Sequence, residues 1–449
     1  MTSRVLLGFG ALLVASSVAA QVSITNIEPG ETVRYPILAL RGEAPSDSIA
    51  IGADWSHAAR FPVTGGQWAG FVELKPGENM IGLQSGRTTV RFKVTYKPMT
   101  TPYKVASIYV MGSDGEEKYI TNQLNEKYPI REKLDVAMKL LQSACAEAMN
   151  QDGRGRTTFN LDTDANGIVN VRFIKLSKTS AEMRAMDNNT AWGFVYDELK
   201  KRLPEDNLRW LGVMGFTDFN RTTAKTSGHF ALGGGALALF GSGSMGWWPA
   251  ALRDVPKKMA DPYVLDPKLM FEDSAGRSTA WSEVSTGYGA MLHELGHTLG
   301  LPHSNDGLSV MSRGFDNFSR WFTVQDPPSK KSEKSVTFGL DQMMRWSPYF
   351  ATRLSYSPWF QADGTARKSE DEPTIKVDGD VISVTSPKGI KVWGADRDDI
   401  APVWGEIKGS ETTKSFSIAD LRKRLATDKE FRFSIVDSWG QIANVDVKT

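Results

Sequence analysis

Cysteine and histidine are scarce in this chain. One cysteine and five histidines occur among 449 residues, so no disulfide can form within the chain. Excess charge is also missing: 53 Lys and Arg against 52 Asp and Glu leave a formal net charge of +1, without the basic excess typical of nucleic-acid binders. Beyond the N-terminus, no apolar run reaches the roughly 18 residues that a membrane span needs. We therefore expect neither a nucleic-acid partner nor a transmembrane segment.

The N-terminus has the pattern of an export signal. A positively charged "MTSR" precedes the apolar run "VLLGFGALLVASSV", and Val18 and Ala20 are small residues before a cut. This pattern predicts a secretory signal peptide over residues 1–20, with cleavage after Ala20. A secreted or periplasmic protein without disulfides is more typical of bacteria than of eukaryotes. We expect a bacterial protein that is exported.

Periodicity divides the rest of the chain into three parts and predicts a multidomain α+β protein. Residues 21–98 contain short strands separated by turns at regular spacing, which predicts an immunoglobulin-like (Ig-like) β-sandwich. Residues 104–355 alternate strands and helices, which predicts an α/β layer with a mixed sheet. Residues 356–449 return to strands, which predicts a small β-rich domain. Within the middle part, helical spacing of apolar residues places Cys145 on a buried helix face, as a core thiol.

Three of the five histidines lie within eleven residues of each other. His293, Glu294 and His297 form the pattern H-E-x-x-H, and on a helix the two imidazoles lie one turn apart on the same face. Gly300 then follows at the position where helices commonly end. The chain can turn there and bring His303 back to the same point. The spacing predicts a site at which three histidines bind one metal ion.

Zinc is the metal that this donor set favours. Three neutral imidazoles leave a fourth tetrahedral position open for water, as catalytic zinc sites require. Zinc bound there would activate the water, and Glu294 is placed to accept its proton as a general base. The sequence therefore predicts one catalytic Zn²⁺ with His293, His297 and His303 as ligands. A structural Ca²⁺ has no comparable motif: "DTDANG" at residues 162–167 has Phe173 where a calcium loop needs Glu, and an Asx turn explains it better.

The extended motif and the methionine after it resemble the signature of the metzincin clan of zinc endopeptidases. The matching positions are His293, Glu294, His297, Gly300, His303 and Met311. The resemblance implies a metzincin-like domain with an active-site helix, in which Met311 forms a turn beneath the metal site. Arg313 departs from astacins and serralysins, where a tyrosine two residues after the methionine is a further zinc ligand. A five-coordinate site is not expected here.

A second resemblance extends from about Lys104 to Tyr356. The segments "HFALGGGALALFGSGSMGWWP" and "LGLPHSNDGLSVMSRGF" are similar to a family of zinc metallopeptidases known mainly from fungal genomes. By this resemblance, Gly234, Gly235, Ala236 and Leu237 would belong to the edge strand above the cleft. An extended substrate could then add to that strand. The alternative is a Gly-rich internal strand without a substrate role.

These features together predict a secreted zinc metalloendopeptidase that acts on proteins or peptides. Two alternatives remain open. The metallopeptidase-like domain could be catalytically idle in a cell-surface protein whose flanking β domains bind carbohydrate or matrix, although Glu294 beside two ligands disfavours this. A zinc amidase acting on cell-wall peptides is a nearer alternative. The sequence does not predict the substrate's side-chain preference.

Overall fold

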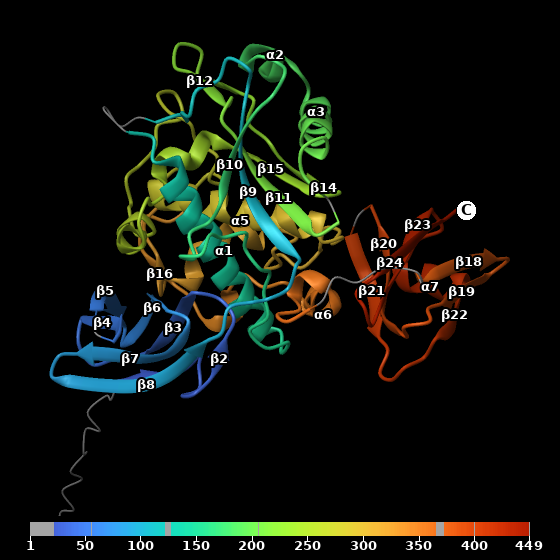
Figure 1. Ribbon diagram of the computed structural model, residues 1–449, viewed down its shortest axis with the longest axis horizontal. Coiled ribbons are helices and arrows are strands. Elements are labelled where there is room, and N and C mark those ends of the chain that lie inside the picture. Colours follow the sequence, from blue (N-terminus) through green and yellow to red (C-terminus); the bar gives the residue numbers. More distant parts are fainter. Residues whose placement is uncertain are drawn as a thin grey trace, which may run out of the picture.

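The structure, a computed structural model, describes residues 22–54, 56–121, 127–204, 206–364, 372–398 and 400–448. The expected signal peptide at residues 1–20 lies outside the described residues. An N-terminal β-sheet, a central α/β layer and a group of C-terminal β-sheets follow one another along the chain, and the central layer lies between the other two (Figure 1). The mixed α and β architecture expected from the sequence is confirmed.

The N-terminal strands form one curled, eight-stranded sheet with the order β1-β3-β6-β5-β4-β7-β8-β2. Strand β5 pairs with both β4 and β6 and so joins the two halves of the curl. Buried apolar residues such as Phe61 and Phe71 face each other inside it. The Ig-like assignment stays a prediction. The strands are β1 (Ser23–Ile24), β2 (Thr32–Val33), β3 (Ile37–Glu43), β4 (Ser48–Ala53), β5 (Ser56–Thr64), β6 (Gln67–Glu73), β7 (Gly77–Ser85) and β8 (Thr88–Tyr96).

The central layer is built on a mixed, five-stranded sheet with the order β10-β9-β11-β15-β14. Its strands are β9 (Lys104–Met111), β10 (Val171–Lys175), β11 (Leu208–Met214), β14 (Ala231–Gly234) and β15 (Leu237–Gly241). All neighbours run parallel except β14, which is antiparallel to β15 and forms the edge. The long helices α1 (Ile130–Gln151) and α5 (Ala280–Thr298) pack on one face of the sheet. Helices α2 (Ser180–Ala185) and α3 (Asn188–Lys200) pack on the other.

Shorter elements complete the central layer and lead out of it. They are the strands β12 (Asp218–Asn220), β13 (Lys225–Ser227), β16 (Gln325–Asp326) and β17 (Val336–Thr337), the helices α4 (Val255–Lys258) and α6 (Pro348–Tyr356), and the 3₁₀ turns η1 (Ser242–Trp247), η2 (Leu252–Asp254), η3 (Arg313–Trp321), η4 (Leu340–Gln342) and η5 (Pro358–Phe360). Among these, η3 packs along α5 and α6 lies next to the C-terminal sheets.

The C-terminal part consists of two small antiparallel sheets that share a core with one helix. Three strands form the outer sheet: β18 (Thr374–Asp378), β19 (Val381–Thr385) and β22 (Thr413–Ser417). Four strands form the sheet nearer the central layer: β20 (Ile390–Arg397), β21 (Ile400–Glu406), β23 (Phe431–Asp437) and β24 (Ile442–Val447). Helix α7 (Ile418–Leu425) packs against β20, β21 and β22.

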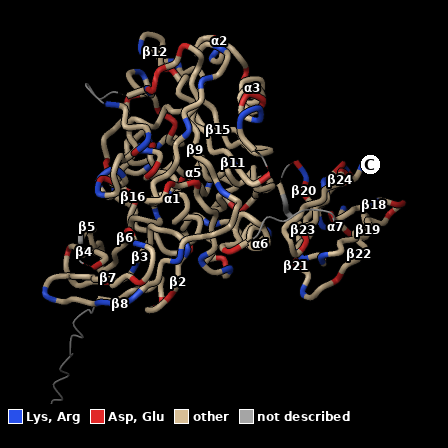
Figure 2. Tube along the Cα trace, viewed as in Figure 1, with Lys and Arg blue, Asp and Glu red and all other residues tan. Residues whose placement is uncertain are grey.

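The single cysteine and the charged residues lie where helical spacing and charge balance predict. Cys145 is fully buried on α1, as predicted, and burial raises the pKa of its thiol to about 12. Basic and acidic side chains are interspersed over the whole trace rather than segregated by sign (Figure 2). Within the described ranges, no helix combines the length and apolarity needed to cross a membrane.

Candidate metal centre

Helix α5 supplies the first two histidines and the turn that leads to the third. Its C-terminus is closed by two backbone hydrogen bonds, from Gly300 N–H to the His297 carbonyl and from Leu301 N–H to the Gly296 carbonyl. Gly300 has a φ of +79°, so this is the Schellman arrangement that glycine favours. The chain reverses direction within two residues and returns His303 to the helix face. The predicted stop at Gly300 is confirmed.

The three histidines converge on one point. Their candidate ligand nitrogens all lie within 4.8 Å of one another, and the Nε2 atoms of His293 and His297 are 3.2 Å apart. Two nitrogens that bind one tetrahedral zinc at 2.0–2.1 Å are separated by about 3.3 Å. The donor set and its spacing therefore fit zinc. Among the described residues, this is the one group of three or more ligand-type side chains that converges in this way.

Backbone carbonyls orient the two helix histidines. Nδ1 of His293 lies 2.7 Å from the Val310 carbonyl oxygen, and Nδ1 of His297 lies 2.8 Å from that of Leu301. A carbonyl only accepts, so each Nδ1 carries the proton and each Nε2 has the lone pair that metal coordination requires. Val310 and Leu301 could not be predicted from the sequence, because a backbone carbonyl is the same acceptor whatever the residue type.

Burial sets the protonation of the site in the absence of a cation. Desolvation, reinforced by His297, lowers the pKa of His293 to about 3, so its imidazole is neutral and available as a ligand. Burial raises the pKa of Glu294 to about 8. A divalent cation beside that carboxyl would lower the value again, because it stabilises the ionised form. A carboxyl pKa between its ordinary value of 4.5 and about 8 suits a group that takes up and releases a proton near neutral pH.

Met311 lies beneath the helix turn that carries the ligands. It is fully buried, and a Cβ atom placed on Gly296 would come within 2.3 Å of the methionine sulfur. The Met311 carbonyl accepts a hydrogen bond from Ser304 N–H, which ties the methionine turn to the loop of His303. Met311 thus contacts the helix through its side chain and the loop of His303 through its backbone, and its role as the turn methionine stays a prediction.

The edge strand runs over Glu294, but its residues differ from those expected. The edge is β14, and a Cβ on Gly233 would lie only 2.2 Å from the Glu294 carbonyl oxygen, so glycine is required there. Of the expected residues, Gly234 belongs to β14. Gly235 and Ala236 form the hairpin turn, and Leu237 is fully buried in the internal strand β15. The expectation of one continuous strand was wrong because the positive φ of Gly235 reverses the chain.

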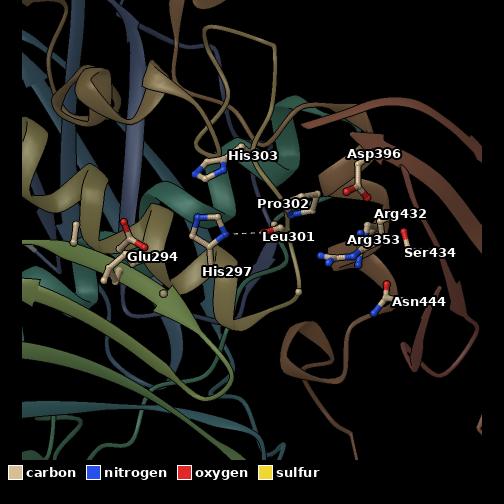
Figure 3. A pocket seen from close by; sticks show the side chains of 14 residues that line it. Glu294, His297, Leu301, Pro302, His303, Arg353, Asp396, Arg432, Ser434 and Asn444 are labelled. Carbon is tan, nitrogen blue, oxygen red and sulfur yellow. Dashed lines mark hydrogen bonds between the residues drawn. The ribbon is translucent and has the colours of Figure 1, made fainter. Parts of the chain in front are cut away.

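A cavity of about 440 Å³ opens beside the histidines and is closed by the C-terminal sheet (Figure 3). Glu294, His297 and His303 line one side together with β14. The other side is polar and comes from α6, β20, β23 and β24: Arg353, Asp396, Arg432, Ser434 and Asn444. Backbone pairing between His303 and Ile400 joins the two sides. This wall could not be predicted from the sequence, because Arg353 lies on a helix of the central part and the other four residues are scattered over strands expected to form a separate domain.

Two further sequence features have local explanations. Arg313 forms an ion pair with Asp316 at 2.7 Å and lies over the Phe315 ring, whose centroid is 5.2 Å from that of His293. In the "DTDANG" segment, Asp164 accepts hydrogen bonds from the N–H groups of Asn166 and Ile168. This is the predicted Asx turn.

Three convergent imidazoles with a buried carboxyl group beside them, next to a strand edge, constitute a candidate metal centre of the hydrolytic type. The chain belongs to the family described as "Putative peptidase family", whose model matches residues 21–392. The resemblance to a metallopeptidase family known mainly from fungal genomes is thereby confirmed, and the match also takes in the N-terminal sheet.

Two fungal proteins are similar over nearly the whole chain. "Putative zinc metalloproteinase C607.06c" of Schizosaccharomyces pombe is 25% identical over 460 residues, which cover 93% of this chain and 73% of that protein. "Putative zinc metalloproteinase YIL108W" of Saccharomyces cerevisiae is 22% identical, covering 92% and 68%. Both names include zinc, in agreement with the histidine triad.

Two solved structures that match this chain share little of its sequence. The catalytically inactive OgpA of Akkermansia muciniphila, in complex with an O-glycopeptide substrate, is 19% identical with a TM-score of 0.46, covering 77% of this chain and 92% of that one. Archaemetzincin from Methanopyrus kandleri is 15% identical with a TM-score of 0.22, covering 54% and 92%.

Proposed function

We propose that this protein is a secreted zinc-dependent endopeptidase with Glu294 as its general base. The observation that carries the proposal is the convergence of His293, His297 and His303 beside Glu294 at the mouth of a cavity. Membership in a peptidase family supports the reaction class. The export signal expected at residues 1–20 supports secretion.

The strand β14 gives the proposal its substrate geometry. Its outer edge has no strand partner among the described residues, and Ala231, Leu232 and Gly233 line the same cavity as Glu294. An extended peptide that adds to this edge would place its backbone over the ligand turn. On this basis we assign residues 104–355 to a metzincin-like domain with Met311 as the turn methionine. Residues 21–98 and 356–449 are the flanking Ig-like and β-rich domains.

The residues of the chain divide the chemistry between them. A zinc ion held by the triad would supply Lewis-acid activation of water and of the scissile carbonyl. Glu294, the carboxyl group nearest to the ligands in sequence, accepts the proton of the attacking water and returns it to the leaving amine. Val310 and Leu301 keep the imidazole lone pairs directed at the ion by accepting the Nδ1 protons.

Replacing Glu294 tests this assignment. Glu294→Gln should keep zinc at one ion per chain and lower the rate of peptide cleavage about 10²- to 10⁴-fold, because the amide cannot accept the proton. The assay is cleavage of a mixed peptide library by the mature chain, with and without a chelator, together with metal analysis. Glu283→Gln is the matched control: Glu283 is a buried carboxyl in the first turn of the same helix, bonded to the Asp273 N–H.

The same assay separates the alternatives. Cleavage at the wild-type rate by Glu294→Gln would contradict the role of the base. Stoichiometric zinc without any chelator-sensitive cleavage would contradict the endopeptidase and favour a binding protein with an idle site. Chelator-sensitive cleavage of cell-wall peptides, without cleavage of protein-like peptides, would favour an amidase.

A further inference from the structure

Arg353, on helix α6, is a buried cation without an acidic partner in the part of the chain that the structure describes. It is 5% exposed. Its guanidinium donates one hydrogen bond, 3.0 Å long, to the Tyr349 hydroxyl and lies 5.4 Å from the centre of that ring. Its Nε is buried and makes no hydrogen bond. An arginine stays charged at any pH at which proteins fold, so burial without a counter-charge is unfavourable.

Other buried or half-buried arginines among the described residues do have partners. Arg156 pairs with Glu147 at 2.8 Å, and Arg320 pairs with Asp326 at 2.7 Å. Arg41 donates to two backbone carbonyl groups at a helix end. Arg353 differs from these because its single polar contact is a neutral hydroxyl. The folded chain thus contains a desolvated positive group whose hydrogen-bonding capacity is mostly unused.

The position of Arg353 connects it to the metal centre. It lines the cavity beside the histidines and also a second cavity of about 270 Å³ under Gly300. His297 lines both cavities as well. Figure 3 shows the guanidinium between His297 and the wall formed by Ser434 and Asn444. A group that enters beside the ligand turn therefore reaches Arg353.

The charged groups around Arg353 do not neutralise its positive charge. No Asp or Glu of the described residues lines the second cavity. Arg209, its other cation, already donates to the Thr298 carbonyl and stacks on Trp359 at 3.8 Å. In the first cavity, Asp396 lies opposite Arg432 in the register of β20 and β23. No carboxylate of the described residues lies within ion-pair distance of Arg353, so the missing partner is not supplied by these walls.

We infer that Arg353 forms an anion subsite that binds a carboxylate of the peptide substrate next to the bond that is cleaved. This inference rests on the proposed peptidase function and adds a selectivity to it. A guanidinium presents parallel N–H groups that match a carboxylate, and the buried setting strengthens the interaction. The carboxylate comes either from an Asp or Glu side chain or from the C-terminus of the peptide.

Binding to the inactive, zinc-loaded Glu294→Gln protein tests the subsite without requiring catalysis. The probes are fluorescent Ala-based nonapeptides with a single Glu at each position in turn, the matched Gln peptides, and one peptide with a free or an amidated C-terminus. We expect at least one Glu peptide, or the free-acid peptide, to bind about 10-fold tighter than its neutral match. Adding Arg353→Met should abolish that difference and leave the binding of the neutral peptides unchanged.

Matched variants distinguish the loss of the subsite from a loss of folding. Arg202→Met removes a half-exposed cation that pairs with Glu198 outside both cavities and should retain the full preference. Arg353→Lys keeps the charge but loses the planar fork, so the preference should fall without a loss of zinc. Thermal unfolding and metal content are measured for each variant, and Arg353→Lys decides if Arg353→Met does not fold.

The outcomes distinguish the subsite from the proposed function. A preference that depends on Arg353 supports the subsite, and the responding peptide shows whether a side chain or a terminus supplies the anion. Equal binding of charged and neutral peptides, an unaltered preference in the Arg353 variants, or no binding at all overturns it. Failure of the peptidase function itself shows separately, as absence of chelator-sensitive cleavage by the wild-type protein.

Discussion

Backbone acceptors, rather than side chains, hold the imidazoles of His293 and His297 in place. Each Nδ1 donates to a carbonyl, one in the methionine turn and one in the loop that leads to His303. Because those two segments are joined by the hydrogen bond from Ser304 N–H to the Met311 carbonyl, the orientation of both ligands depends on one connected piece of backbone. At the scale of single residues, the site is therefore preorganised by chain path as much as by residue type.

Asp152 provides a pH-dependent contribution to stability at the same scale. It ends helix α1, and its Oδ2 accepts the N–H of Trp346 at 3.2 Å. Burial raises the pKa of Asp152 to about 6. The folded state thus holds a proton that the unfolded chain, with a pKa near 3.9, has released, so stability is fully present below about pH 4 and falls as pH rises toward 6.

Asp152→Asn tests this prediction. Asparagine keeps an acceptor for Trp346 but does not titrate. We expect the free energy of unfolding of the wild type to fall by about 1–2 kcal/mol relative to Asp152→Asn between pH 4 and pH 7, after allowance for solvent screening. Urea unfolding of both proteins at several pH values measures the difference. A difference that stays constant with pH, or grows in the opposite direction, would show that Asp152 ionises without penalty.

At the scale of elements, the end of α5 is where sequence and tertiary structure meet. A Cβ on Gly300 would face two problems: the residue has a φ of +79°, and the atom would lie 2.8 Å from Cδ1 of Ile442 in β24. The first is a local requirement of the helix stop. The second arises because the C-terminal sheet packs directly against that stop. Glycine at position 300 therefore satisfies the helix and the cavity wall together.

We expect Gly300→Ala to lower the free energy of unfolding by about 1–3 kcal/mol and to weaken zinc binding, because the return of the chain to His303 is disturbed. Gly307→Ala in the following loop is the control, since a Cβ there meets nothing within 4 Å. Denaturant unfolding and a zinc competition titration provide the two readouts. Combining Gly300→Ala with Ile442→Ala should relieve the contact but not the backbone strain, so recovery should be partial. Full recovery of the free energy of unfolding would mean that the positive φ at position 300 does not destabilise an alanine there.

The sequence predicts elements of this site as far as they depend on short-range spacing. Histidines four residues apart must share a helix face, and a glycine before a proline must end the helix, so the triad and its turn could be derived. The edge strand could be derived only in part, because "GGGALA" contains a hairpin turn and either half could form the edge. The choice between Gly233 and Leu237 depends on which strand pairs with β11, and this pairing is a tertiary contact: β15 does so, which leaves β14 at the edge.

At the scale of the whole molecule, the cavity belongs to two parts of the chain that look independent in sequence. Strand periodicity in residues 372–448 predicts a β-rich unit but not the face that it turns toward the histidines. That face carries Ser434 and Asn444 opposite each other on β23 and β24, and backbone pairing at Ile400 attaches it to the loop of His303. A polar residue on an outward strand position looks like any solvated surface residue until its neighbour is known. Arg353 could not be singled out for the same reason.

A buried ionic cluster attaches the N-terminal sheet to the central layer. Glu147 on α1 is 2% exposed, accepts from the Tyr35 hydroxyl at 3.1 Å and the Asn26 side-chain amide at 3.2 Å, and pairs with Arg156 at 2.8 Å. Arg156 in turn contacts Glu31 at 2.5 Å. Asn26 and Tyr35 precede β3, and Glu31 lies next to β2. The cluster therefore spans the junction between the N-terminal sheet and the central layer. Its members are interdependent, because removing one leaves the others buried without a partner.

Glu147→Gln should therefore destabilise the whole protein by about 3–5 kcal/mol, with the N-terminal sheet and the central layer unfolding in one transition at lower denaturant. Glu78→Gln is the control, since the pair of Glu78 with Lys93 is more than half exposed on both sides and should contribute less than about 1 kcal/mol. Replacing both partners, Glu147→Leu with Arg156→Met, should recover much of the loss because no charge then remains unpaired. Two separate transitions in Glu147→Gln, with the zinc site intact through the first, would show instead that the N-terminal sheet folds independently of the domain that carries the histidines.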